Sequence, residues 1–311
     1  EDILSGRPRA WGFVWLARDR ELGPKEYARR VHEYCVDNNV DVCIIERLHL
    51  AYLREALPPG VRAFIDTHDL VSVREAALRA HRLRDEHTVT RDQEFAILGK
   101  FDRTILIQQE DYADLCIAIG AEKCILTPHP VDFSKQTVRP RVGSIGFVAS
   151  GWIANIHAMK WFLEDIWPLV RRPGLTFDIH GRICSLLTEI STQGLVLKGY
   201  GEDLDAVYGA IDIVVNPIRA GAGLKIKSVE ALGNGLPLVT TTEGARGLPA
   251  SDRPCLLIAD DTAAFAGHLN RLIDDPDLRQ RLAQSAYDYA RRYFSADACY
   301  GSLIAEIDQA P

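Results

Sequence analysis

The segment from Ile211 to Thr241 restricts the possible folds of this chain more than any other segment, because several structural signals follow one another in it. Ile211–Val215 is a short apolar run typical of a strand buried on both faces of a parallel sheet. Gly221 and Gly223 allow a tight turn, and the residues from about Leu224 to Gly233 predict a helix with a glycine cap. A helix that follows such a loop directs free N–H groups and a positive dipole end at a ligand. The segment therefore predicts an anion site, most simply for a phosphate or diphosphate.

Charged residues on this helix suit a ligand that carries both phosphate and hydroxyl groups. Lys225 and Lys227 add positive charge in the first turn, where the dipole alone favours acidic residues. Glu230 follows Gly223 by seven residues, about two turns, and so projects from the same side of the helix. Its carboxylate can accept paired hydroxyl hydrogen bonds, as from a ribose or a hexose. The alternative is an ion pair with Lys227, and spacing alone leaves both interpretations open.

The residues from Pro217 to Thr241 resemble the donor-site signature of family 4 of the glycosyltransferases, and Gly244-Ala-Arg-Gly-Leu248 continues the likeness. The resemblance implies the two-domain GT-B fold and a nucleotide-sugar donor whose ribose is bound by the glutamate at the position of Glu230. The family normally has a second glutamate eight positions earlier, where this chain has Ala222. That departure leaves open which groups hold the sugar of the donor.

The same resemblance implies where the rest of the donor lies. The diphosphate would lie over the loop of Gly221, Ala222, Gly223 and Leu224, with its charge offset by Lys225, Lys227 or Arg219. In the resembled family a histidine of the first domain contacts the donor sugar across the cleft, and His68 matches that position. His68 also follows a predicted strand, where open α/β sheets bind ligands. The alternative is that Asp69 caps a helix and His68 is only a loop residue.

Three further loops of the second domain follow predicted strands. The first, from Ser150 to Asn155, is another candidate phosphate loop, although a glycine turn before a helix can also be a simple cap. Arg182 and Gly199 end two other strands on the side where similar proteins bind the nucleoside. Tyr200 can stack on the base, but an aromatic residue at a strand end more often packs in the core.

Strands and helices alternate along the chain, which predicts an α/β protein with parallel sheets covered by helices. The alternation restarts after the polar segment Ser134–Val142, where we place the linker. In the second half, for example, we expect a helix over Cys184–Thr192. Together with the resemblance, this predicts two Rossmann-like domains facing a cleft (1–136 and 137–294) and a return helix (295–311) that packs on the first domain. The usual first strand and glycine-rich turn of such a fold are missing, so we expect an incomplete N-terminal domain.

Composition excludes several other classes of protein. A net charge of −7 argues against a dedicated nucleic-acid binder. The 7 cysteines contain no Cys-x-x-Cys pair and no zinc-type cluster, as expected for reduced thiols. No apolar run approaches the roughly 20 residues of a membrane-spanning helix, and no secretion signal opens the chain. We therefore expect a cytoplasmic protein, with peripheral association at the inner membrane face left open.

From the resemblance we expect a retaining glycosyltransferase that moves a sugar from a UDP-, GDP- or dTDP-sugar to a saccharide, a lipid-linked or another hydroxyl acceptor in glycan assembly. His68 and Glu230 would be the central residues, with no metal and no cofactor beyond the donor. Two alternatives remain at this point: a non-catalytic nucleotide-sugar-binding subunit, and an epimerase or phosphorylase on the same scaffold. The sequence does not specify the sugar, the base, the acceptor or the oligomeric state.

Overall fold

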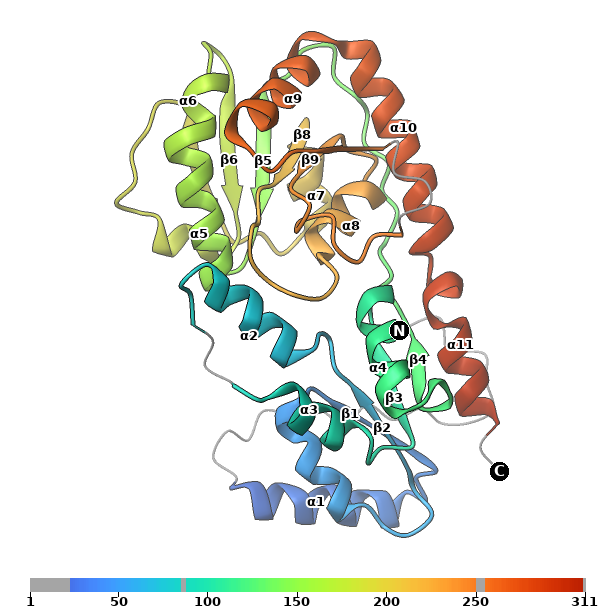
Figure 1. Cartoon of the computed structure of the whole chain (residues 1–311). Helices are drawn as coiled ribbons and strands as arrows, with labels where there is room; N and C mark the ends of the chain where they lie inside the picture. Colours follow the sequence, from blue (N-terminus) through green and yellow to red (C-terminus); the bar gives the residue numbers. More distant parts are fainter. Residues whose placement is uncertain (1–22, 85–87, 250–254, 310–311) are drawn as a thin grey trace.

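A computed structural model describes residues 23–84, 88–249 and 255–309, and it places them in two α/β domains (Figure 1). Residues 1–22, with which the predicted first domain begins, and residues 310–311, at the end of the predicted return helix, lie outside the described residues. The prediction of an α/β protein with two parallel-sheet domains is confirmed. Within the described residues, none of the helices has both the length and the apolar character needed to cross a membrane.

The first domain contains a four-stranded parallel sheet in the order β1-β2-β3-β4. Its strands are β1 (Val42–Glu46), β2 (Arg62–Asp66), β3 (Arg103–Leu106) and β4 (Cys124–Leu126). The helical segments between and before them are α1 (Pro24–Asp37), η3 (Leu48–Ala56), α2 (Val71–Ala80), α3 (Arg91–Leu98), α4 (Gln109–Ile119) and η4 (Ala121–Lys123). The middle of β2 is buried on both faces, as expected for a strand covered by helices on each side.

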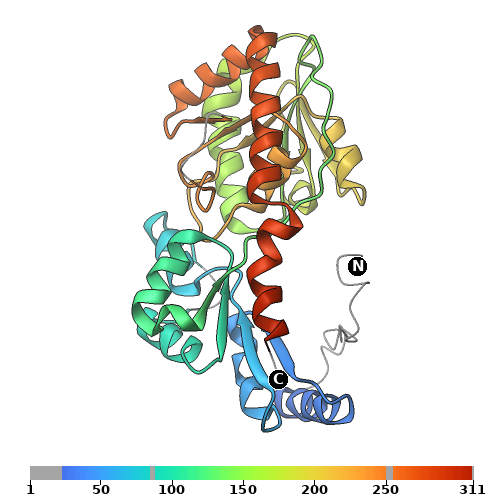
Figure 2. The same cartoon turned by 90° about the vertical axis from the view of Figure 1, so that its right-hand side faces the viewer.

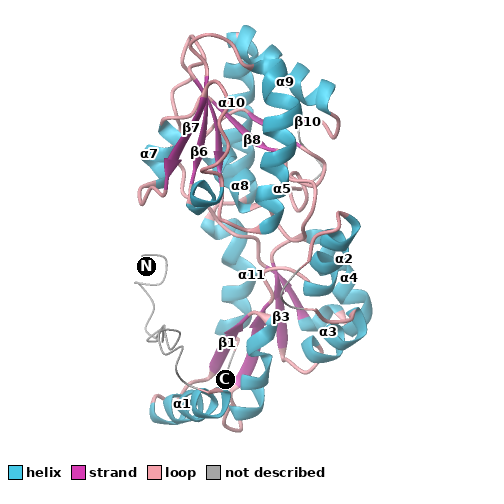
Figure 3. Cartoon of the chain, turned by 90° about the vertical axis from the view of Figure 1, so that its left-hand side faces the viewer, coloured by secondary structure: helices cyan, strands magenta, loops and turns pink. Residues whose placement is uncertain are grey.

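The second domain contains a six-stranded parallel sheet in the order β10-β9-β8-β5-β6-β7 (Figure 3). Its strands are β5 (Ser144–Val148), β6 (Thr176–His180), β7 (Leu195–Gly199), β8 (Ile213–Asn216), β9 (Leu238–Thr240) and β10 (Leu256–Ile258). After β5 the chain continues to one side of the sheet, and after β8 it continues to the other. Open α/β sheets bind ligands beyond the carboxyl ends of the two strands at such a reversal.

Helices cover both faces of this second sheet. One face carries α5 (Ile153–Trp161), its π-helical continuation η5 (Phe162–Ile166), α6 (Trp167–Val170) and α9 (Thr262–Asp274) around a core that includes Phe147, Phe177 and Phe265. The other face carries α7 (Leu204–Gly209), α8 (Ile226–Gly233) and α10 (Pro276–Tyr293). The short segment η6 (Arg182–Leu186) connects β6 to β7.

The two domains meet at several places. The last helix, α11 (Ala296–Asp308), follows α10 and reaches back to the first sheet (Figure 2). There Ile307 packs with Phe64, Ile105 and Ile125, and Glu306 forms an ion pair with Arg103 at 2.8 Å. On the opposite side, Leu78 of α2 packs against Ala154 and Ala158 of α5 and against the loop after β8. These contacts fix how the strand ends of both sheets face each other.

Two predicted elements differ from the structure. The helix expected from about Leu224 begins at Ile226, because Lys225 belongs to the preceding loop and turns back onto it. The helix expected over Cys184–Thr192 is wrong, since η6 ends at Leu186 and residues 187–194 form turns and irregular structure. Ile183, Cys184 and Leu187 are buried at helical spacing, which explains the error: they fill the core from a single turn.

Helix α2 is capped by a residue from another helix. Glu94 of α3 is buried and accepts hydrogen bonds from Val71 N at 2.7 Å and Ser72 N at 2.9 Å. We expect Glu94→Gln to lower the free energy of unfolding by about 2 kcal/mol, because an amide keeps only one acceptor oxygen for these donors. Urea unfolding measures this, with the exposed Glu33→Gln as the control that should change by less than about 0.5 kcal/mol. Equal losses of unfolding free energy in both variants would show that the buried cap does not stabilise the protein more than an exposed glutamate does.

Candidate functional site

The candidate site lies where β5 and β8 end side by side at the centre of the second sheet. The loop after β5 leads through Ser150 into α5, and the loop after β8 leads through Gly221 and Gly223 into α8. Both helices therefore begin at the same edge of the sheet. The carboxyl ends of the first sheet's strands face this edge, since Gly223 lies against the backbone of His68 and Asp69.

The glycines of the second loop are required by its conformation and by its neighbours. Gly221 has φ 147° and Gly223 has φ 66°, backbone angles that residues other than glycine rarely adopt. A Cβ at Gly221 would lie 3.2 Å from the ring of Trp152, and a Cβ at Gly223 would lie 2.9 Å from Cβ of Asp69. The loop thus allows a close approach of backbone to a ligand and to the other domain.

Lys225 holds this loop in shape. Its ammonium donates to the carbonyl oxygens of Ala222 at 3.1 Å and Gly223 at 3.0 Å, and to the carboxylate of Glu243 at 2.8 Å. These three contacts account for its three N–H bonds. Burial lowers the pKa of Lys225, and Glu243 opposes that effect. Lys225 therefore brings positive charge to the loop, and its hydrogen bonds hold the loop in shape.

Lys227 connects the two loops that form the crevice. Its Nζ donates to Oδ1 of Asn155 at 2.5 Å, and Nδ2 of Asn155 donates to the carbonyl oxygen of Ser150 at 3.1 Å. The ammonium also lies 4.6 Å from the ring centre of Phe147. Burial and the nearby charge of Lys225 lower the pKa of Lys227 to about 7. Lys227 thus keeps N–H donors for an anion between the two helix N-termini, and Asn155 positions it rather than capping α5.

Glu230 is positioned by a buried tyrosine of α7. The hydroxyl of Tyr208 donates to Oε2 of Glu230 at 2.6 Å, so the other carboxylate oxygen is left for a second donor. Burial raises the pKa of Tyr208, and the negative charge of Glu230 adds to the rise. The alternative of an ion pair between Glu230 and Lys227 is not what the structure shows, because Lys227 turns to Asn155.

His68 faces the cleft from the first domain in a strained backbone conformation. It has φ 59°, in the left-handed region, and its N–H donates to Oδ1 of Asp66 at 3.1 Å. Its Nε2 lies 4.0 Å from Oδ2 of Asp66. The alternative that Asp69 caps α2 is wrong, since the cap residue is Leu70 and Asp69 forms an ion pair with Arg74. Strain of this kind is common at functional sites.

The nucleoside candidates lie together at the ends of β6 and β7. The guanidinium of Arg182 stands 5.7 Å from the ring centre of Tyr200. The ring belongs to a residue that is 66% exposed, so Tyr200 is not a core residue and offers a face for stacking. Gly199 has φ 77° and turns the chain at this point. In the sheet, β6 and β7 lie on one side of β5, and β8 with its helix α8 lies on the other. A nucleoside attached to a diphosphate in the crevice would extend toward β6 and β7.

The remaining predicted residues have other surroundings. Arg219 is exposed and stands 4.7 Å from the ring centre of Trp161, along α5 rather than in the crevice. Ala222 and Leu224 are buried, and Leu224 packs against Gly247 of the loop after β9. Ala222 contributes its carbonyl oxygen to Lys225 and has no polar side chain to offer.

Sequence reasoning missed three residues that the structure brings to the site. Trp152 packs against Gly221 from the loop after β5. Glu243 lies on the other side of Gly221 and is bonded to Lys225 and, at 3.3 Å, to Arg246. His129, in the segment between β4 and the linker, lies within electrostatic reach of Glu230, His68 and Asp66. A carboxylate 18 residues after a buried lysine leaves no local sequence signal, so only the fold reveals this pair.

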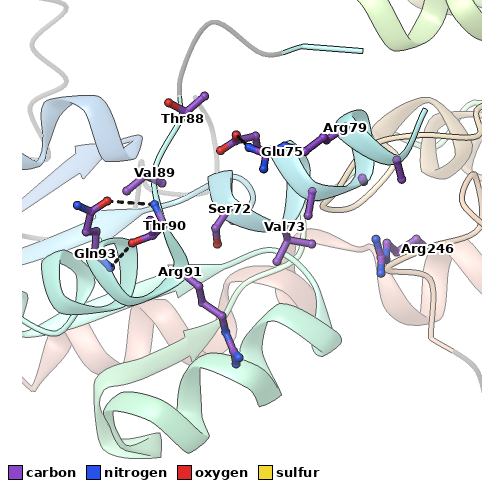
Figure 4. Close-up of a pocket in the computed structure, with 13 residues that line it drawn as sticks. Ser72, Val73, Glu75, Arg79, Thr88, Val89, Thr90, Arg91, Gln93 and Arg246 are labelled. Atoms are coloured by element: carbon purple, nitrogen blue, oxygen red, sulfur yellow. Dashed lines mark hydrogen bonds and ion pairs between the residues drawn. The ribbon is translucent and has the colours of Figure 1, made fainter. Parts of the chain in front are cut away.

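A large hollow lies beside this crevice. It has a volume of about 1020 Å³ and is lined mainly by α2 and by the segment from Thr88 to Gln93 (Figure 4). Arg246 is the residue of the second domain that borders it. Because Arg246 also bonds to Glu243, the hollow adjoins the glycine loop.

Comparisons with known proteins agree with this geometry. Residues 143–275 match the family model described as Glycosyl transferases group 1. An uncharacterized 44.6 kDa protein of the cps region of Klebsiella pneumoniae is 22% identical over 223 residues, which cover 68% of this chain and 57% of that protein. D-inositol 3-phosphate glycosyltransferase of Corynebacterium kroppenstedtii is 34% identical over 94 residues, or 30% of this chain and 21% of that protein.

Among solved structures, HepE from Anabaena in complex with UDP has a TM-score of 0.68 at 15% identity, over 90% of this chain and 81% of that one. At this identity the likeness concerns the fold, and the structural neighbours have the GT-B fold that was predicted. The second domain is similar to the group 1 glycosyltransferase model over residues 143–275, which agrees with the predicted class of enzyme. The chain spans just over half the length of its Klebsiella relative.

Proposed function

We propose that the chain is a glycosyltransferase that transfers a sugar from a nucleoside diphosphate sugar to a hydroxyl group. The observation that carries the proposal is the ammonium of Lys227, held by Asn155 between the N-termini of α5 and α8 in the crevice of the second sheet. Helix N-termini and a half-buried cation form a site for a diphosphate. The family match over residues 143–275 supports the same class of reaction.

The other residues of the crevice fit the remaining parts of such a donor. Tyr208 bonds to Oε2 of Glu230, so the other carboxylate oxygen, Oε1, would accept hydrogen bonds from the ribose. Tyr200 and Arg182 would stack on the base. UDP is bound by HepE, a protein of the same fold, and we propose UDP as the first nucleotide to test.

In the proposed reaction, the bond between C1 of the sugar and the diphosphate oxygen breaks, and the acceptor oxygen forms a bond to C1. The proton of the acceptor hydroxyl goes to the departing diphosphate. Lys227 and the helix N-termini would stabilise the negative charge that develops on the diphosphate. His68 would contact the sugar from the first domain and help to fix its orientation. The resemblance to family 4 supports retention of configuration at C1, which NMR of the product anomer tests.

The acceptor would approach through the hollow beside α2, which adjoins the glycine loop through Arg246. Small and hydroxyl-bearing residues line it, among them Ser72, Ala76 and Thr90. Such a wall suits a saccharide, either free or linked to a lipid. We propose that the protein acts in glycan assembly in the cytoplasm, with peripheral association at the inner membrane face if the acceptor is lipid-linked.

Calorimetric titration of UDP, GDP, dTDP and ADP into the full chain tests the donor site. We expect one nucleotide to bind selectively, and we expect Glu230→Gln to weaken it about 10-fold, because a neutral amide accepts ribose hydrogen bonds less well than a carboxylate. The exposed Glu164→Gln on the same domain serves as the control and should bind as the wild type does. A folded protein that binds none of the four nucleotides would contradict the proposed function.

A further inference from the structure

Polar atoms of the first domain are enclosed without partners where the two domains touch. Gln108, just after β3, is 1% exposed, and its amide lies beside the carboxyl group of Asp111, whose pKa it lowers. Neither its amide oxygen nor its amide nitrogen forms a hydrogen bond of ordinary geometry with a described residue. Asp111, in the first turn of α4, is 5% exposed, and its Oδ2 likewise has no partner among the described residues. Buried polar groups in folded proteins normally have partners, so these atoms indicate a site that a ligand or water completes.

The loop after β9 forms the opposite wall of this site. A Cβ at Gly247 would lie 3.1 Å from Cβ of Gln108, so the two domains are in contact here. The same loop carries Glu243, whose Oε1 would lie 3.7 Å from a Cβ at Gly221. Arg246, which bonds to Glu243, lies close enough to Asp111 to affect its pKa. An amide and a carboxyl of one domain thus stand near a carboxylate and a guanidinium of the other.

The position of Glu243 is fixed by its neighbours in the chain. Gly244 N donates to Oγ1 of Thr241 at 2.9 Å, and Gly244 O accepts from Oγ of Ser228 at 2.9 Å. A Cβ at Gly244 would lie 2.1 Å from Oγ1 of Thr240, so the loop is packed directly on β9. The carboxylate is therefore held in place before any ligand binds, as a binding group should be.

We propose that Gln108, Asp111 and Glu243 form a subsite for the hydroxyl groups of the transferred sugar, an inference that rests on the proposed function. Glu243 would supply the carboxylate that the glycine loop lacks at Ala222. It lies next to the proposed diphosphate site, because Lys225 bonds to both Glu243 and the carbonyl oxygen of Ala222. The amide of Gln108 both donates and accepts, which suits a sugar hydroxyl that does the same.

The charges of this subsite favour a neutral hexose. Asp69, Asp111 and Glu243 all carry carboxyl groups, and burial together with the nearby Asp69 raises the pKa of Asp111 to about 6. The cations beside these groups are already engaged, since Arg74 forms an ion pair with Asp69, and both Lys225 and Arg246 bond to Glu243. A uronic acid would therefore bring one more carboxylate to cations that already have partners. We therefore expect UDP-glucose to bind at least about 10-fold more tightly than UDP-glucuronic acid, by repulsion between like charges.

Gln108→Leu tests the subsite, because it removes both polar atoms of the amide and, among the described residues, only its weak contact with Asp111. Leucine is apolar and somewhat shorter than glutamine, so the variant should keep a Tm close to that of the wild type. Calorimetry then measures Kd for UDP and for UDP-glucose, or for GDP with GDP-mannose or dTDP with dTDP-glucose if another nucleotide binds. We expect the affinity for the nucleotide to stay unchanged and the affinity for the nucleotide-sugar to fall about 10-fold.

Thr127→Val is the matched control, because Thr127 directly follows the neighbouring strand β4 and its buried hydroxyl also has no described partner. It should change neither affinity. An unchanged nucleotide-sugar affinity in Gln108→Leu would overturn the subsite while leaving the proposed function intact, whereas absent nucleotide binding in the wild type would overturn both. If Gln108→Leu does not fold, Asp111→Asn takes its place: a selective loss of nucleotide-sugar affinity supports the subsite, and an unchanged affinity overturns it.

Discussion

Replacing Lys227 by methionine is expected to weaken binding of the nucleotide-sugar about 10- to 100-fold at pH 6, because the diphosphate loses a charged hydrogen-bond donor. Methionine matches the length of much of the lysine stem and can keep the contact with Phe147. The contact of Lys227 with Asn155 is lost, yet Asn155 remains bonded to Ser150 and so keeps the loop after β5 in place. The loss should therefore concern the ligand rather than the fold.

The pH dependence follows from the pKa of Lys227, which burial lowers to about 7 in the folded protein from its ordinary value of 10.5. A bound diphosphate favours the protonated ammonium, so affinity should be greatest below pH 7 and fall by up to about tenfold per pH unit above it. The diphosphate of a nucleotide-sugar does not titrate in this range. In Lys227→Met the affinity should be almost independent of pH from 6 to 9.

Stability should change in the opposite direction. The unfolded chain holds a proton on Lys227 up to about pH 10.5, whereas the folded chain releases it near pH 7. Between these values the unfolded state binds more protons, so this residue makes folding more favourable as pH rises and least favourable below pH 7. The free protein of Lys227→Met should therefore have a higher Tm than the wild type, with the larger difference at pH 6.

Calorimetry and thermal unfolding at pH 6 and pH 9 measure both effects. Lys160→Met, an exposed lysine on α5, is the matched control and should leave the affinity, its pH dependence and the Tm nearly unchanged. If Lys227→Met keeps the wild-type affinity at pH 6, the ammonium does not contact the diphosphate. That outcome would contradict the proposed diphosphate site in the crevice between β5 and β8.

The elements of the site could be predicted from the sequence because their signals are local. The apolar run before Asn216, the glycines at 221 and 223 and the cap at Gly233 define strand, loop and helix within one short segment. The crevice itself could not be predicted from these residues alone. The crevice forms because β8 pairs with β5, a strand that lies much earlier in the chain. The residues of the two strands do not specify this pairing by themselves.

The roles of the individual charged residues depend on contacts across the fold. Lys225 and Lys227 are two positions apart and equivalent in the sequence, yet one faces Glu243 and the other faces Asn155. Gln108 carried no sequence signal, because an amide at a strand end is common and only its burial without a partner makes it informative. Sequence therefore locates the loop that binds, whereas packing decides which of its side chains remain free to bind.

Arg279 is a buried residue whose loss should strongly destabilise the described part of the chain. It lies in α10 and is 1% exposed. Its guanidinium donates to the carbonyl oxygens of Leu272 at 2.6 Å and Ile273 at 3.1 Å, which belong to the last turn of α9. Its other terminal nitrogen donates to the carbonyl oxygens of Arg139 at 3.1 Å and Pro140 at 2.7 Å in the interdomain linker. One side chain thus joins the end of a helix to the linker.

We expect Arg279→Met to lower the free energy of unfolding by about 3–4 kcal/mol, since it leaves several enclosed carbonyl oxygens without donors. Arg279→Lys should recover only part of this, because a single ammonium lacks the planar fork that serves both the helix end and the linker. Urea unfolding measures the loss, with the exposed Arg281→Met on the same helix as the control, expected within about 0.5 kcal/mol of the wild type. Full recovery by lysine would mean that charge alone matters at this position. A loss confined to Arg279→Met and Arg279→Lys would instead mean that the geometry of the guanidinium fixes the linker, and with it the orientation in which the strand ends of the two domains face each other.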